Sequence, residues 1–187
     1  VLQTAWTFFF SFQLFTASFI AVVLTLISLV SLLLTQIHTI SSDEKRSWPE
    51  YILFRFPFYL HTGWMVLMAT DHFALLFRAF GTSAHMQAAI DILSLALLLA
   101  VGVACLIRPP YNDFVIPSVV IWCFLGIASR LENPSDKMLE IYGNTLVLAI
   151  RDCSFILAGV LGCCLSPCVV VWMARECCII RVVELEN

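Results

Sequence analysis

The chain has 187 residues, of which 61% are hydrophobic and only 12% are charged. Soluble domains are close to half apolar and about a quarter charged, so this composition excludes an ordinary soluble domain. Together with a mean hydropathy of +0.95, it indicates an integral membrane protein. The formal net charge of −3 excludes the basic surface that a nucleic-acid-binding protein needs.

The apolar runs and the polar segments between them predict an all-α bundle of five transmembrane helices, forming a single domain over residues 1–187. The spans are expected at about residues 5–34, 51–80, 88–107, 113–130 and 138–173. The first run holds no charged residue and is longer than the membrane core requires, so it is expected to tilt or protrude. Pro57 predicts a kink inside the second span, and Pro117 lies in the first turns of the fourth.

The fifth span contains the adjacent charged residues Arg151 and Asp152. Neighbouring side chains on a helix point about 100° apart, so the two are not expected to pair with each other, and each would need a partner on another helix. The alternative is a membrane span limited to residues 153–173, with the pair at the membrane interface. We slightly favour this alternative, because 21 residues suffice to cross a bilayer.

The cationic residues of the short loops give an expected orientation. Five spans place Lys45, Arg46, Arg108, Arg175 and Arg181 on one face, and Arg78, Arg130 and Lys137 on the other. The richer face is expected to be cytoplasmic, stromal or matrix-side, and it includes the C-terminus. Asp71 and Arg78 are interpreted as the end of a helix that rises into the lipid headgroups.

Two histidines in the second span are the candidate ligand-binding residues. His61 and His72 are eleven residues apart, which is about three helical turns, so both can line one helix face. Neutral imidazole is a good axial ligand for the metal of a tetrapyrrole, and Trp64 and Phe58 could stack on the macrocycle. His61 is the better candidate, because His72 is expected nearer water at the helix end. The alternative is that each histidine only hydrogen-bonds a neighbouring helix.

The eight cysteines contain no C-x-x-C pair and no nearby histidine at zinc spacing, so no metal site is expected. Cys177 and Cys178 follow the last span and are candidates for lipidation by S-palmitoylation, with free thiols as the alternative. No hydrolase elbow, P-loop, zinc-protease motif or dinucleotide fingerprint is present. The chain is therefore expected to be non-catalytic, without catalytic residues.

The run FRFPFYLHTGW at residues 54–64, followed by the apolar residues 65–70, resembles the tryptophan-rich sensory protein/translocator protein family. The segments VIP at residues 115–117 and WCFLGIA at residues 122–128 are similar to a later helix of that family. The resemblance includes Pro57, Gly63 and Pro117, for which structural roles are expected. It implies a five-helix bundle with a cavity for porphyrins, sterols or related apolar ligands.

Two hypotheses for function follow. The first is a non-catalytic accessory subunit of a large photosynthetic or respiratory supercomplex, in a thylakoid or mitochondrial inner membrane. Its 15 Phe and small extramembrane mass suit lateral packing against lipids, other subunits, chlorophyll or carotenoid pigments. The alternative is a free-standing translocator-type binder or transporter of porphyrin, sterol or another apolar ligand.

Overall fold

The computed structural model describes the backbone of residues 2–39, 51–107 and 114–185, and the side chains of residues 2–36, 51–107 and 114–171. Within these ranges every regular element is helical, which confirms the all-α prediction. The elements are α1 (Leu2–Ser11), α2 (Phe15–Thr39), the π-helical η1 (Tyr51–Arg55), α4 (Phe56–Ala79), α5 (Ala84–Ile107), α6 (Val115–Arg130), α7 (Asp136–Tyr142) and α8 (Asn144–Leu185).

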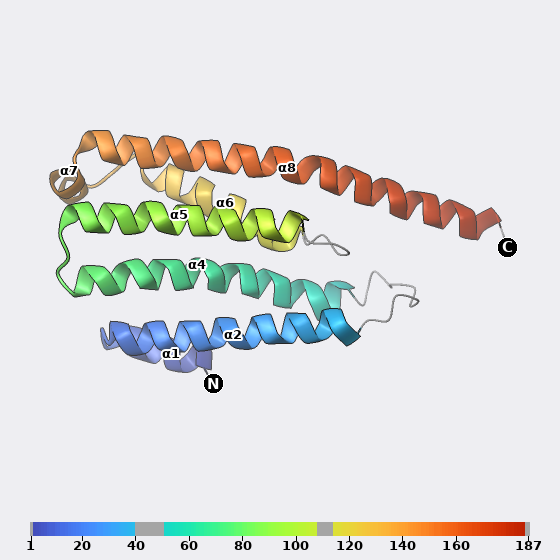
Figure 1. Ribbon diagram of the computed structural model, residues 1–187, viewed down its shortest axis with the longest axis horizontal. Helices are drawn as coiled ribbons and strands as arrows, with labels where there is room; N and C mark the ends of the chain where they lie inside the picture. Colours follow the sequence, from blue (N-terminus) through green and yellow to red (C-terminus); the bar gives the residue numbers. More distant parts are fainter. Residues whose placement is uncertain (1, 40–50, 108–113, 186–187) are drawn as a thin grey trace.

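The long helices α2, α4, α5, α6 and α8 lie side by side, and consecutive ones run in opposite directions (Figure 1). Helix α4 is central, because it contacts α2 on one side and both α5 and α6 on the other. Helix α8 packs against α5 and α6, and the short α7 lies at the end of the bundle where α4 and α6 finish.

Three helices are long and apolar enough to cross a membrane, at Phe15–Gln36, Ala84–Ile107 and Asn144–Val171. Helix α6 is apolar, but with 16 residues it is shorter than these three candidate spans. Helix α4 has 24 residues, but polar side chains such as His61, Asp71 and Arg78 lower its hydropathy. The described residues therefore support an integral membrane bundle and do not confirm the expected count of five transmembrane helices.

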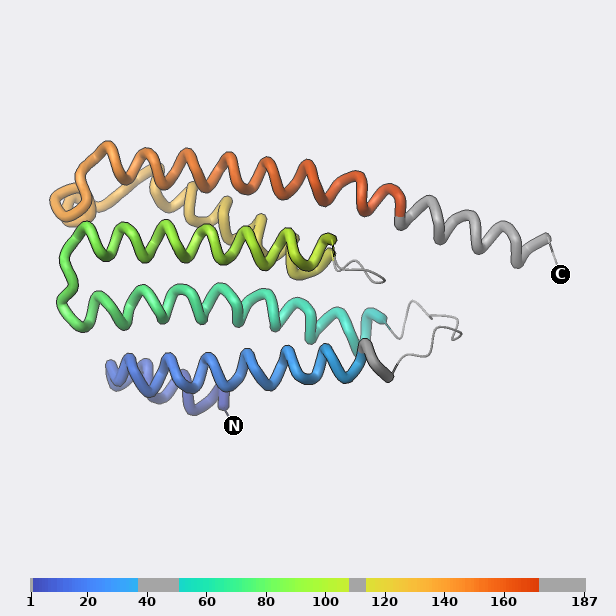
Figure 2. The backbone as a smooth tube through the Cα atoms, in the orientation of Figure 1, coloured from blue at the N-terminus to red at the C-terminus, as the bar shows by residue number. Residues whose placement is uncertain are grey.

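The first expected span is two helices rather than one. Residues 12–14 reverse the chain, so that α1 lies against α2 (Figure 2). The Leu14 amide donates to the Phe9 carbonyl (2.9 Å) and the Gln13 amide to the Phe10 carbonyl (3.0 Å), a Schellman pair. Gln13 occupies the left-handed position with a φ of 58°. The prediction of one helix over residues 5–34 is therefore wrong. The left-handed position of such a turn is usually occupied by Gly or Asn, and Gln13 gives no such signal in the sequence.

The last expected span is also divided. Gly143, with a φ of 74°, ends α7 and precedes α8. This backbone conformation is strained for any residue with a side chain, so glycine permits the break. The span predicted at residues 138–173 is therefore not one helix, because α7 ends at Tyr142 and α8 begins at Asn144. The alternative, a membrane span limited to residues 153–173, stays a prediction.

The prolines lie where helices begin or change type. Tyr51–Arg55 form a π-turn, and regular α-helix begins at Phe56 with Pro57 in its first turn. Proline lacks an N–H and clashes with the carbonyl four residues earlier, so the wider π geometry before it accommodates the ring. The sequence predicts a kink at Pro57 inside the span, whereas the structure places Pro57 in the first turn of α4, directly after the change from π- to α-helix. Pro117 lies in the first turn of α6, as expected.

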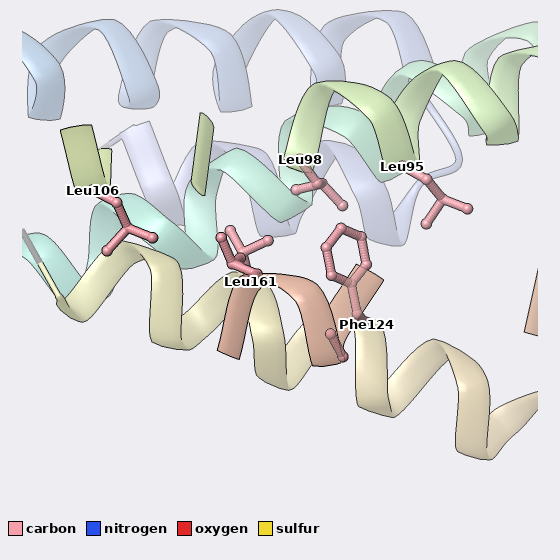
Figure 3. Packing of buried hydrophobic residues seen from close by; sticks show 7 residues of the cluster. Leu95, Leu98, Leu106, Phe124 and Leu161 are labelled. Carbon is pink, nitrogen blue, oxygen red and sulfur yellow. The ribbon is translucent and has the colours of Figure 1, made fainter. Parts of the chain in front are cut away.

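The core lies between α5, α6 and α8. It consists of buried side chains from all three helices: Leu95, Leu98, Leu106, Val120, Phe124, Ala158 and Leu161. Leu95, Leu98 and Leu161 lie around the Phe124 ring (Figure 3). A Cβ on Gly102 would lie 2.8 Å from Leu161 Cδ2, so this glycine lets α5 and α8 approach closely.

Candidate functional site

A groove between α4 and α6 contains two of the candidate ligand-binding residues that the sequence predicts. His61 and Trp64 line it together with Pro57, Leu60, Val119 and Trp122, and its volume is about 420 Å³. The Trp64 and Trp122 rings lie with their centroids 6.2 Å apart and their planes 35° from each other. His61 is thus the polar residue in a groove with two indole rings, which suits a flat apolar ligand.

The two helices meet tightly beneath this groove. A Cβ on Gly63 would lie 3.0 Å from the Val119 Cβ, so glycine at this position permits the contact. Gly63 thus lies at the close contact between α4 and α6. Phe58, which was expected to bind the ligand beside His61, is half-buried and is not among the residues that line the groove.

His72 has a different environment from the one predicted. Its side chain is only 3% exposed and does not face water. Trp6 Nε1–H donates to His72 Nε2 (2.8 Å), and His72 Nδ1 lies 2.9 Å from the Met68 carbonyl oxygen, to which it donates. The Phe10 ring lies 5.4 Å from the imidazole. Both ring nitrogens are thus bonded inside the protein, and His72 joins α1 to α4. No nitrogen is left to bind the metal of a ligand. This arrangement matches the alternative in which the histidine hydrogen-bonds a neighbouring helix.

A second site lies inside the bundle, at the end where α7 packs. It is a cavity of about 200 Å³ between α4, α5, α6 and α8. Most of its wall is apolar and comes from Leu67, Ala74, Leu95, Leu98, Ile127, Val147 and Ile150. Asp71, Arg78, Asp91 and Ser94 make one side polar. Apolar walls with a few converging polar groups are typical of a small-molecule site.

An ion pair defines the polar side of this cavity. Arg78 Nη2 donates to both carboxylate oxygens of Asp91, at 3.0 and 2.9 Å, and so joins α4 to α5. Arg78 lies in the last turn of α4, and the interpretation of this helix end as one that rises into the headgroups stays a prediction; the ion pair with Asp91 is an additional contact. Asp71 makes no hydrogen bond or ion pair within the described part of the chain, and Ser94 Oγ is buried without a partner there. These two groups can receive the polar part of a ligand.

Arg151 and Asp152 pair with each other, contrary to the prediction. Arg151 Nε donates to Asp152 Oδ1 (2.8 Å), and Arg151 Nη2 lies 2.7 Å from the same oxygen. The long arginine side chain bends across the angle between neighbouring positions, which the simple helical geometry did not allow for. The pair lies within the candidate span Asn144–Val171 and does not line either site.

The cysteines add no site in the described region. Cys105, Cys123, Cys153, Cys163, Cys164 and Cys168 carry free thiols. Among the residues searched there, no group of three His, Cys, Asp or Glu side chains could hold a metal ion. The lipidation candidates Cys177 and Cys178 lie outside the described side chains.

Comparison with known proteins identifies the family. No curated protein and no solved structure matches the chain. The family model described as TSPO-like protein matches residues 1–162. This match covers most of the chain and agrees with the resemblance carried by residues 54–70 and 115–128. The chain belongs to the TSPO-like protein family.

Proposed function

We propose that the chain is a translocator-type membrane protein that binds a small apolar molecule with one polar group in the cavity between α4, α5, α6 and α8. The observation that carries this function is the cavity itself, which combines apolar walls with Asp71, Ser94 and the Arg78–Asp91 pair on one side. Family membership supports the same class of function.

The size of the cavity restricts its ligand. Small-molecule sites usually enclose about 300–1,000 Å³, and this cavity encloses about 200 Å³. It therefore fits a small ligand, or one end of a longer molecule such as a sterol. Because the Ser94 hydroxyl is buried without a partner in the described part of the chain, a ligand hydroxyl or amine beside Ser94 and Asp71 is favoured over a purely apolar end.

Filling the cavity is expected to weaken binding. Ala74 is buried in α4 and lines the cavity, so Ala74→Leu places a larger side chain in the ligand volume. Binding of a fluorescent sterol to the purified chain in detergent should weaken by about tenfold or more, which corresponds to about 1.4 kcal/mol. Ala79→Leu is the matched control, because Ala79 is exposed on the same helix and both residues favour helix. Equal sterol affinity in the two folded variants would refute the cavity as the site.

A metallated tetrapyrrole bound in the groove is the second candidate. The groove is larger than the cavity, and His61 makes no hydrogen bond within the described contacts, so its imidazole is available beside Trp64 and Trp122. Zinc protoporphyrin is the suitable probe, because its metal accepts an axial imidazole. His61→Phe should abolish the shift of its absorption maximum, whereas His85→Phe, at an exposed position outside the groove, should preserve it. The same shift in both variants would eliminate His61 as the ligand.

The accessory-subunit hypothesis becomes the weaker of the two initial hypotheses, because the family match favours a binder. Exposed apolar side chains such as Leu53, Trp122, Ile156 and Val170 suit contact with lipid as well as with other subunits. Pigment binding, an organelle membrane and a C-terminus on the stromal or matrix side stay predictions from the sequence.

A further inference from the structure

A basic depression lies at the α7 end of the bundle, beside the cavity. Its volume is about 340 Å³, and three cationic side chains from three helices line it: Arg78 of α4, Arg130 of α6 and Lys137 of α7. Asn133 and Ser135, from the segment between α6 and α7, lie in the same wall. These are the three cations that the sequence places together on one face of the membrane, and the structure gathers them at a single site.

The charge balance of the depression is positive. No carboxylate is among the residues that line it, although Glu132, Asp136 and Glu140 come from the same part of the chain. Arg78 is paired with Asp91 through Nη2, which leaves its Nε and Nη1 without a described bond. Arg130 and Lys137 form no ion pair within the described ranges. After the pairing of Arg78, the two other cations that line the depression have no ion-pair partner within the described ranges.

A hydrogen bond between two helices positions α7, which carries Lys137. The Tyr142 hydroxyl of α7 donates to Gln87 Oε1 of α5 (2.8 Å), and Gln87 Nε2 donates to the Thr82 carbonyl (2.8 Å). These bonds fix α7 against the start of α5, and α7 carries Lys137. The backbone that carries Lys137 is therefore positioned by the fold, which lowers the ordering cost of binding.

We propose that this depression binds a phosphate group with two negative charges, such as a phosphomonoester. Two cations without a described ion-pair partner match the charge of the group, and guanidinium N–H donors match the geometry of its oxygens. The Asn133 amide and the Ser135 hydroxyl can donate to the remaining oxygens. The proposal does not depend on the ligand of the cavity.

The same chemistry is offered by a lipid headgroup and by a soluble phosphate, and two probes separate these sources. The full chain in phosphatidylcholine nanodiscs is titrated with inorganic phosphate against chloride at equal ionic strength, and the thermal unfolding midpoint is recorded. In parallel, native mass spectrometry compares retention of phosphatidic acid and phosphatidylcholine. Arg130→Gln and Lys137→Gln each remove one cation from the site, and Arg55→Gln removes one from α4's other end.

Each site variant should weaken phosphate or phosphatidic acid binding by about tenfold, the range of a charge-assisted hydrogen bond. Arg55→Gln should leave binding unchanged, and Arg130→Lys and Lys137→Arg should retain most of it. If the site variants lose binding of phosphatidic acid only, the natural ligand is a lipid headgroup. If they lose binding of inorganic phosphate, it is a soluble phosphate compound. Either result supports the site. Equal behaviour of Arg55→Gln and the two site variants, or no saturable binding of either probe, would overturn the proposal.

Discussion

Phe124→Ala is expected to lower the free energy of unfolding by about 3–5 kcal/mol, the range for deleting a buried aromatic side chain. Phe124 is fully buried between α5, α6 and α8. Its removal leaves a void that the rigid helices around it fill only in part. Reversible unfolding in mixed micelles measures the effect.

Phe155→Ala is the matched control for this change. Phe155 lies on α8 with 42% of its surface exposed, so its loss should change the same free energy by no more than about 0.5 kcal/mol. Similar losses in both variants would mean that the α5–α6–α8 contact does not form the stable core. Leu95 and Leu98 touch both the core and the cavity, so Phe124→Ala should also enlarge the space open to a ligand.

The sequence was sufficient to predict the helical membrane bundle, because this depends on long apolar runs and local turn residues. Gly81, for example, follows the end of α4 with a φ of 71°, a conformation that glycine adopts readily. The reversal at Gln13 could not be predicted in the same way. Glutamine has no particular preference for the left-handed conformation, and what holds this turn is the packing of α1 on α2.

The candidate sites were predictable only in part, for a related reason. His61 and Trp64 are one turn apart on a single helix, so their presence in one groove follows from local geometry. Trp122 completes the groove from α6, and the pairing of Arg78 with Asp91 crosses from α4 to α5. Such contacts depend on how the helices are rotated against each other, which a single sequence does not encode in a readable local pattern.

The bond between Trp6 and His72 gives the second large expected effect. His72→Phe retains an aromatic ring but removes the acceptor for the Trp6 indole N–H. A buried donor without a partner costs about 1–3 kcal/mol, so the free energy of unfolding should fall by this amount. The hydrogen bond from Trp6 to His72 links α1 to α4. Its loss should therefore also let the backbone amides of Leu2–Ser11 exchange their hydrogens faster.

A double-mutant cycle separates this bond from ring packing. Trp6→Phe removes the donor, and the combination with His72→Phe leaves two apolar rings and no unpaired polar group. The double variant should therefore recover part of the stability lost in His72→Phe, with a coupling of about 0.5–3 kcal/mol. Strictly additive losses would show that the 2.8 Å contact contributes nothing beyond packing. A favourable coupling would instead show that His72 anchors the N-terminal helix. The neutral imidazole donates through Nδ1 to the Met68 carbonyl and accepts through Nε2 from Trp6.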